Sequence, residues 1–306
     1  MKFACISIDY DEINDYRKIH DISELKDSLS ITRDSSKGIE SLIRNAKVPI
    51  TAFLTGASYR PFFEDFMDKV KDGLAEVANH SYSHDYALTR SDPVYIEAQI
   101  RSLHDLIAEY GVIMKGFRSP GWHLNAEIAQ VLQAVGYSYT SCFNPSRLYY
   151  AMKYIWIKLS KITGKTPASV IHPIDTLRTP TLPYFPDPQK PHICSDLQQT
   201  LLEIPISVSL IPPFVPFTGY FIFKLKNPKF ILPRHEHPAI FNLHALDFVH
   251  ENSPSGRFLK SKEGVLQTPL SIRLNVLENI IKNLKNKGYQ FVTMETLRNN
   301  LNSHSA

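Results

Sequence analysis

The sequence predicts an α/β fold in which parallel strands are covered by helices. Short apolar runs, several of them β-branched, alternate with helical patterns through the first half of the chain and again after Ile231. This alternation is typical of parallel sheets and barrels with helices outside. The 306 residues are 43% hydrophobic and 21% charged, which is ordinary globular composition and excludes disordered and low-complexity classes.

The individual elements follow from hydrophobic periodicity and from the residues that end each run. Buried strands are expected at residues 2–8, 49–54, 74–78, 115–117, 136–140, 239–243 and 289–292. Helices are expected at residues 36–47, 60–72, 92–110, 125–135 and 270–287 and from Met294 onward, with Ser91 or Asp92 as a cap for the third of them and Pro93 in its first turn. The alternation fails after Pro145, so we expect one domain, residues 1–306, with an irregular insertion at residues 146–235.

Charge and cysteine content exclude several classes of protein. A net charge of +4 is too small to indicate a nucleic-acid partner. Cys5, Cys142 and Cys194 are too far apart for a CxxC metal site and odd in number, so we expect them to be buried small apolar residues. The N-terminal residues have no signal-peptide pattern, and prolines interrupt the uncharged run 204–223, so we expect a cytoplasmic protein.

Polar side chains stand at the ends of four expected strands. Asp9 and Asp11 follow the first strand, with Tyr10 on the opposite side of an extended segment, and His80 and His84 follow the strand at residues 74–78. Arg118 and His244 follow two further strands. The carboxyl ends of parallel strands in a barrel share one face, where active sites are built.

This set of residues is what a metal-dependent hydrolase needs. Two imidazoles at i and i+4 can bind one ion from a helical turn, and a carboxylate completes the set. A second carboxylate can act as general base and a separate histidine as general acid. Each feature also has a structural explanation: the acids could cap a helix, Arg118 could lie on the surface, and His244 could be a core residue.

Four segments, in order along the chain, resemble the motifs of the polysaccharide deacetylases (NodB homology, carbohydrate esterase family 4). They are the acid pair Asp9 and Asp11, the run His80–Ser81–Tyr82–Ser83–His84, the run Arg118–Ser119–Pro120–Gly121, and the strand end Asn242–Leu243–His244. The spaced acid pair is closest in style to the branch that contains the deformylase of undecaprenyl-phosphate-linked formamido-arabinose. The resemblance implies a distorted (β/α) barrel.

The resemblance also implies a role for each residue. Asp9 would be the general base and His244 the general acid, and Arg118 would hold and tune the base. Asp11, His80 and His84 would hold one divalent ion, Zn²⁺ in preference to Co²⁺ or Ni²⁺, although Glu12 is a second candidate ligand. The backbone N–H near Gly121 would stabilise the oxyanion, and Trp122 would stack on a sugar ring or, alternatively, belong to the core.

Residues 146–165 predict a basic amphipathic helix. Lys153, Lys158 and Lys161 fall within one arc of a helical wheel at about 100° per residue, and aromatic and aliphatic residues fill the rest. Such a helix suits an anionic membrane surface, with residues 204–223 as a second apolar contact. The alternative is that the helix packs on the barrel and its lysines face water.

We therefore expect a metal-dependent hydrolase that removes an N-acetyl or N-formyl group from an amino sugar. A cytoplasmic enzyme cannot reach finished cell-wall polymer, so a polyprenyl-phosphate-linked sugar, a glycolipid precursor of the cell envelope, is the expected substrate. Two alternatives remain at this point: a non-catalytic barrel that binds glycans or lipid-linked sugars and retains a relic site, and a hydrolase of a non-sugar amide.

Overall fold

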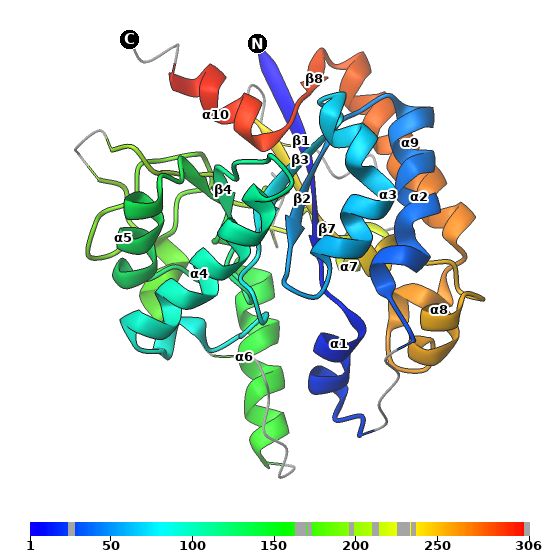
Figure 1. Ribbon diagram of the computed structural model, residues 1–306, viewed down its shortest axis with the longest axis horizontal. Coiled ribbons are helices and arrows are strands. Elements are labelled where there is room, and N and C mark those ends of the chain that lie inside the picture. Colours follow the sequence, from blue (N-terminus) through cyan, green and yellow to red (C-terminus); the bar gives the residue numbers. More distant parts are fainter. Residues whose placement is uncertain are drawn as a thin grey trace.

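Parallel strands form the centre of the protein in this computed structural model, which describes residues 1–23, 28–162, 170, 173–195, 199–209, 214–224, 233 and 237–302. In this part of the chain, eight strands share one sheet in the order β6-β5-β4-β3-β2-β1-β7, and β8 pairs with β1 (Figure 1). The strands are β1 (Lys2–Tyr10), β2 (Ile50–Leu54), β3 (Ala75–Asn79), β4 (Gly116–Phe117), β5 (Tyr139–Thr140), β6 (Leu202–Glu203), β7 (Ala239–His244) and β8 (Tyr289–Phe291). Apart from β6, each was predicted from an apolar run.

The sheet curls until the chain after β6 reaches β7. Ser207 donates its backbone N–H to Ile240 O at 3.1 Å, and Asn242 donates to Phe217 O at 2.9 Å. These hydrogen bonds join the two ends of the strand order, so the sheet is a distorted barrel, as predicted. Its central strand β1 is buried from Phe3 to Tyr10, which explains why that strand is almost entirely apolar.

Helices surround the sheet. The six helices predicted outside the insertion are present with shifts at their ends, whereas those at Ile13–His20 and Pro254–Leu259 were not predicted. Figure 1 shows α2 between α3 and α9, and α4 beside α5. The helices are α1 (Ile13–His20), α2 (Ile31–Ala46), α3 (Tyr59–Lys71), α4 (Pro93–Ala108), α5 (Ala126–Val135), α6 (Arg147–Ile162), α7 (Gly219–Ile222), α8 (Pro254–Leu259), α9 (Leu270–Asn286) and α10 (Met294–Asn302). The expected cap at Asp92 is confirmed, because its side chain accepts a hydrogen bond from Tyr95 N. Helix α2 begins earlier than predicted because Ser30 caps it.

Helix α6 lies where the sequence predicted it, but Lys153 is directed inward, whereas Lys158 is exposed as expected. Lys153 is only 9% exposed and its Nζ donates to Gly121 O, whereas the apolar side chains of Ile155, Trp156 and Leu159 are exposed. The lysine lies inward because the helix packs over the turn that contains Gly121. Figure 1 shows α6 extending away from the sheet, on the side to which α1 also projects.

The insertion at residues 146–235 is described in part. Its described elements are α6, a 3-10 helix (Ile174–Arg178), β6 and α7, while residues 163–165 and 210–213 of the expected membrane-contact segments lie outside the described residues. The single-domain organisation stays a prediction. Cys5 and Cys142 are buried as expected, but Cys194 is exposed, because it lies on a surface loop that makes a short antiparallel bridge to Pro186.

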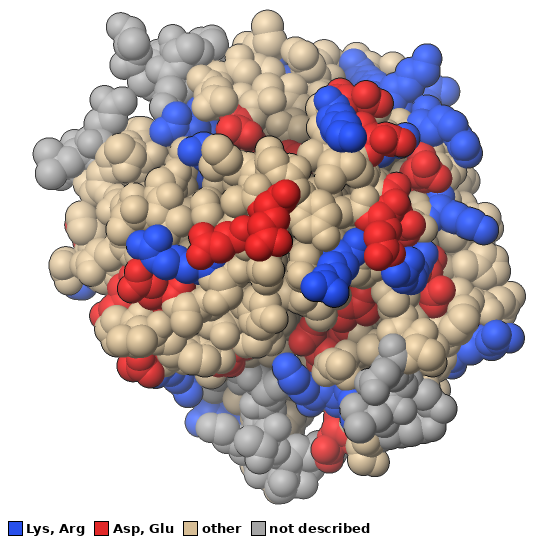
Figure 2. All heavy atoms as spheres, in the orientation of Figure 1, with Lys and Arg blue, Asp and Glu red and all other residues tan. Residues whose placement is uncertain are grey.

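Two surface properties bear on partners. In the part of the chain that is described, no helix combines the length and apolar character needed to cross a membrane. Figure 2 shows one face of the molecule, on which lysine and arginine are interspersed with aspartate and glutamate. That face therefore carries no extended field of one sign, which a nucleic-acid-binding surface would need.

Candidate metal centre and active site

The acid pair lies at the end of β1, inside the barrel mouth. Asp9 is 1% exposed and Asp11 is 4% exposed. Tyr10 points to the other side of the strand, where its ring meets Phe62 edge-on at 5.1 Å between centroids. Strand alternation thus places both carboxylates on one side, as the sequence predicted.

His80 and His84 follow β3 in a loop rather than in the helical turn that their spacing suggested. Ser81 and His84 have φ values of 65° and 53°, which belong to the left-handed region and not to a helix. The loop is fixed by Asn79, whose side-chain oxygen accepts from Ser81 N, and by Gln99 of α4, whose side-chain oxygen accepts from Ser83 N and Oγ. The pair converges because of these hydrogen bonds.

Asp11, His80 and His84 present donor atoms that all lie within 4.8 Å of one another. Oδ1 of Asp11 is 3.5 Å from Nε2 of His80 and 3.2 Å from Nε2 of His84. This oxygen is buried and makes no hydrogen bond to the described residues, so an ion would satisfy it. Two imidazoles and one carboxylate are a donor set that zinc and similar cations use, and the residues therefore fit a divalent metal.

The second ring nitrogens of both histidines face acceptors. Nδ1 of His80 donates to Arg118 O at 2.8 Å, so that in the neutral imidazole Nε2 carries the lone pair and is directed toward the site. Nδ1 of His84 lies 3.6 Å from a carboxylate oxygen of Asp15, a residue of α1. Burial alone would raise the pKa of Asp11, but the adjacent His84 and His80 hold it well below its usual value. Asp11 is therefore ionised, as a metal ligand must be.

Glu12 points away from this centre. Its two oxygens accept hydrogen bonds from Ile13 N at the start of α1, from Ile31 N and Thr32 N at the start of α2, and from Ser30 Oγ. Glu12 thus joins the N-termini of two helices, where a negative charge is stabilised. Of the two acids considered from the sequence, Asp11 is the one beside the imidazoles.

Asp9 lies between a cation and an amide. Arg118 Nη1 donates to its Oδ1 at 2.6 Å, and Asn242 Nδ2 donates to its Oδ2 at 2.9 Å. Arg118 is fully buried and its other guanidinium nitrogens are held by Ser7 and Ser141. Burial would raise the pKa of Asp9, but Arg118 and His80 lower it, so the carboxylate is charged and can accept a proton.

His244 ends β7 directly opposite Asp9, its partner in the β1–β7 register. Its Nε2 is 4.0 Å from Asp9 Oδ2 and 3.7 Å from Asp11 Oδ2, and its side chain is 32% exposed. Burial would lower the pKa of His244, but Asp11 and Asp9 raise it above its ordinary value. The protonated form, which a general acid needs, is favoured.

The turn after Arg118 lies at the same site. Gly121 and Trp122 have φ values of 76° and 59°, and a Cβ at Gly121 would approach Tyr86 to 3.2 Å. The Trp122 ring meets Tyr149 of α6 edge-on at 4.9 Å. Gly121 and Trp122 line, together with Asp9, Asp11, His80, His84, Tyr86, Tyr149 and His244, one cavity of about 130 Å³. The roles expected for Gly121 and Trp122 stay predictions.

Residues 26–140 match the model of a family described as polysaccharide deacetylase. That stretch of the chain is similar to the polysaccharide deacetylases. This similarity supports a hydrolase of carbon–nitrogen bonds other than peptide bonds. A search of curated proteins returns no match.

Several solved structures of deacetylases and carbohydrate esterases align with the chain. A candidate polysaccharide deacetylase from Mycobacterium smegmatis aligns with a TM-score of 0.62 at 14% identity, over 99% of this chain and 90% of that one. A family 4 carbohydrate esterase from Streptomyces lividans, in complex with acetate, gives a TM-score of 0.44 at 13% identity over 94% and 90%. A peptidoglycan deacetylase from Bacillus subtilis gives 0.44 at 14% identity over 100% and 94%. The first of these likenesses supports the barrel fold described above.

Several residues of the site were not given a role from the sequence. Asp15 beside His84, Asn242 beside Asp9, and the serines that hold Arg118 all act through contacts between distant segments. A usable signal existed only for Asn242, which stands two residues before His244 on the same strand and therefore points to the same side. For Asp15 and the serines, no local pattern marks the contact.

Proposed function

We propose that the protein is a metal-dependent hydrolase that removes an N-acetyl or N-formyl group from an amino sugar. One observation carries the proposal: a charged Asp9 held by Arg118, a raised-pKa His244, and the Asp11–His80–His84 set all line one small cavity. These are the base, the acid and the ligands that amide hydrolysis requires.

Each residue of the site has a separate role in the proposed reaction. A divalent ion held by Asp11, His80 and His84 would lower the pKa of a water molecule and polarise the amide carbonyl. Asp9 accepts a proton from the attacking water as the new C–O bond forms. A backbone N–H near Gly121 stabilises the oxyanion, and His244 donates a proton to the nitrogen as the C–N bond breaks. The products are an amino sugar and acetate or formate.

The finer features of the function are extensions of this proposal. The ion is Zn²⁺, with Co²⁺ and Ni²⁺ as substitutes that the same donors accept. The substrate is an amino sugar carried on a lipid such as polyprenyl phosphate, a glycolipid precursor of the cell envelope. The protein meets it at the inner face of the cytoplasmic membrane through α6 and residues 204–223. The exposed apolar side chains of α6 support this contact.

Metal content and product release, measured together, test the function. The wild-type protein should hold about one equivalent of divalent metal, as expected for a single three-ligand site, and release acetate or formate from N-acylated amino sugars. His80→Ala/His84→Ala should lose both the metal and turnover. Asp9→Asn should keep the metal while turnover falls roughly 10²- to 10⁴-fold, since it removes only the base.

His250→Ala, a substitution at a side chain that is 54% exposed, is the matched control and should behave as wild type. A wild-type protein that takes up no metal after dialysis against zinc or cobalt would contradict the proposal and favour a non-catalytic binding barrel. Acetate release from simple amides but not from amino sugars would favour a hydrolase of non-sugar amides instead.

A further inference from the structure

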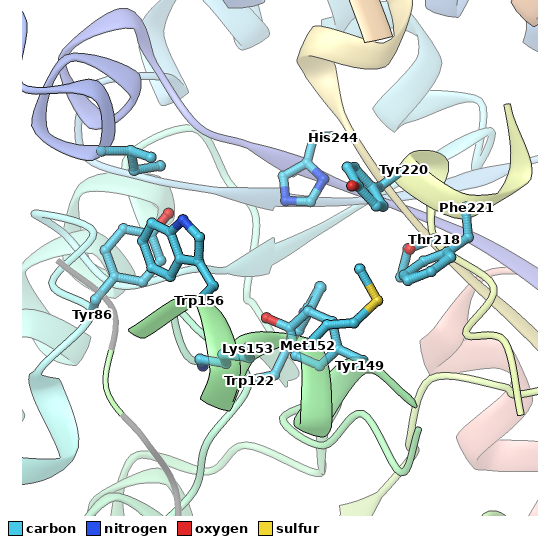
Figure 3. Close-up of a pocket in the computed structure, with 11 residues that line it drawn as sticks. Tyr86, Trp122, Tyr149, Met152, Lys153, Trp156, Thr218, Tyr220, Phe221 and His244 are labelled. Atoms are coloured by element: carbon cyan, nitrogen blue, oxygen red, sulfur yellow. The ribbon is translucent and has the colours of Figure 1, made fainter. Parts of the chain in front are cut away.

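An apolar cavity of about 390 Å³ adjoins the small cavity of the metal centre. Its walls come from α6 (Tyr149, Met152 and Trp156), from α7 (Tyr220 and Phe221) and from Ile19 of α1. Figure 3 shows His244 on one side of this cavity, the α6 residues opposite, and Tyr220 and Phe221 closing a third side. Its volume lies within the range of small-molecule sites, about 300 to 1,000 Å³.

The lining of this cavity suits a hydrocarbon better than a sugar. A buried sugar needs a hydrogen-bond partner for most of its hydroxyl groups, because an unpaired polar group is costly away from water. The walls are instead aromatic and aliphatic, with Thr218, Lys153 and His244 as the side chains of more polar character. Lys153 already donates to Gly121 O. Burial of an alkyl chain against such walls is favourable because it removes apolar surface area from water.

The position of the apolar cavity indicates whether it faces the sugar side or the acyl side of the scissile amide. His244, the proposed donor to the leaving nitrogen, lines both cavities, and so do Tyr86, Trp122 and Tyr149. The acid pair and the two metal-site imidazoles line only the small cavity. The apolar cavity therefore lies on the amine side of the scissile bond, where the sugar stands, and not on the acyl side.

We propose, on the basis of the function proposed above, that this cavity binds a hydrocarbon chain attached to the amino sugar. The sugar then lies across the junction of the two cavities, with its amide at the metal centre and its lipid between α6 and α7. Chains longer than the cavity can leave it along an apolar path, because Met152, Trp156 and Tyr220 are 40%, 46% and 53% exposed. The cavity thereby selects amphipathic substrates over bare polysaccharide.

A series of glycosides tests where the chain binds. Methyl, butyl and octyl glycosides of N-acetylglucosamine should be hydrolysed with kcat/KM rising about two- to fourfold for each added methylene that enters the cavity. Methyl glycosides that carry the octyl chain on the nitrogen, as N-octanoyl amides, should show no such gain. Equal kcat/KM for methyl and octyl glycosides would overturn the proposal, and a gain restricted to the N-octanoyl series would place the chain on the acyl side instead.

Fluorescence gives a second readout that does not depend on turnover. The chain has two tryptophans, Trp122 and Trp156, and both line the apolar cavity. Octyl glucoside, added below its micellar concentration, should shift their emission saturably to shorter wavelength. Phe221→Asp should remove this shift by placing a charge in the cavity. Tyr154→Ala, at an exposed aromatic position of α6 outside the lining, should retain it.

The two readouts separate the failure of this inference from failure of the proposed function. Hydrolysis without chain-length dependence and without an emission shift would refute the hydrocarbon site while leaving the hydrolase intact. A saturable shift that Phe221→Asp removes, with no hydrolysis of any glycoside, would support the site and refute the hydrolase.

Discussion

At the scale of single residues, the buried pair of Arg118 and Asp9 is the most consequential interaction. Neither side chain is more than 2% exposed, and they are joined at 2.6 Å. The guanidinium also lies over the Phe53 ring, 4.0 Å from its centroid. Removing one partner of such a pair leaves a buried charge without compensation, so the loss is much larger than for a surface pair.

We expect Arg118→Met to lower the free energy of unfolding by about 3–5 kcal/mol, because Asp9 would lose its cation in the barrel interior. Arg101→Met breaks a surface ion pair with Glu97, in which the two side chains are 45% and 48% exposed. It should change the free energy of unfolding by about 1 kcal/mol or less. Denaturant titration of both variants measures the two values. Equal, small losses would mean that the buried pair contributes little.

The sequence indicated the residues of the candidate site by their positions along the chain, but it did not indicate which residues contact them. Asp9, Asp11, His80, Arg118 and His244 stand at or just after strand ends, a pattern visible in one dimension. The choice between Asp11 and Glu12 was not visible, because Glu12 is drawn away by backbone N–H groups 19 and 20 residues further on. Contacts over such separations depend on how elements pack.

At the scale of elements, the formation of α6 follows from its local sequence, whereas the face that it buries depends on packing against the rest of the chain. Its helical period was enough to predict the helix, but not which face is buried, since a wheel of apolar residues and lysines fits either a core or a surface. The structure buries Ile157 and Lys153, leaves Leu148, Tyr149 and Tyr150 partly buried, and exposes apolar residues that include Ile155, Trp156 and Leu159. Likewise, spacing at i and i+4 suggested a helical turn for His80 and His84, but positive φ values at Ser81 and His84 exclude it.

The exposed face of α6 leads to a prediction about membranes. Ile155 and Leu159 are four residues apart, lie on one side of the helix, and are each 56% exposed. If they insert into lipid, Ile155→Ser/Leu159→Ser should weaken binding to phosphatidylglycerol-containing vesicles roughly tenfold or more, given the apolar area lost. Cosedimentation with vesicles measures this.

Val94→Ser/Ile113→Ser is the matched control for the vesicle experiment. These side chains are 79% and 67% exposed but lie outside α6, so the control should bind vesicles as wild type does. Equal weakening in both double variants would indicate a general loss of surface hydrophobicity, and unchanged binding in the α6 variant would refute membrane contact through this helix.

At the scale of the whole molecule, the barrel contains two further acids, Glu76, which is partly buried, and Glu203, which is fully buried. Glu76 accepts hydrogen bonds from Thr51, Tyr139 and the backbone of Glu295, and Glu203 accepts from Thr140 and from the backbone of Cys142 and Phe143. Burial raises the pKa of each from 4.5 to about 7, against the lowering effect of these hydrogen bonds. Both acids join strands to neighbouring segments, so their protonation affects the stability of the whole barrel.

This raised pKa makes stability depend on pH in a defined direction. Between pH 4.5 and 7 the unfolded chain has released the Glu76 proton that the folded chain still holds, so the free energy of unfolding falls as the pH rises. Glu76→Gln should remove this contribution. The difference between the free energies of unfolding of wild type and variant should therefore change by up to about 1.4 kcal/mol per pH unit. Denaturant titrations at pH 5, 6 and 7 measure it.

Glu97→Gln, at an exposed glutamate, serves as the control and should stay parallel to wild type across the same range. A constant difference between wild type and Glu76→Gln from pH 5 to 7 would mean that Glu76 is already ionised in the folded protein at pH 5.

The position of the apolar cavity in the sequence also bears on how its ligand preference can change. Both carboxylates, both imidazoles and Arg118 precede the end of the family match at residue 140, whereas α6 begins at Arg147 and α7 at Gly219. The candidate metal ligands and base thus lie in an earlier stretch of the chain than much of the wall of the apolar cavity, while His244 follows both helices. Substitutions within α6 and α7 can therefore reshape the apolar cavity without replacing Asp9, Asp11, His80, His84 or His244.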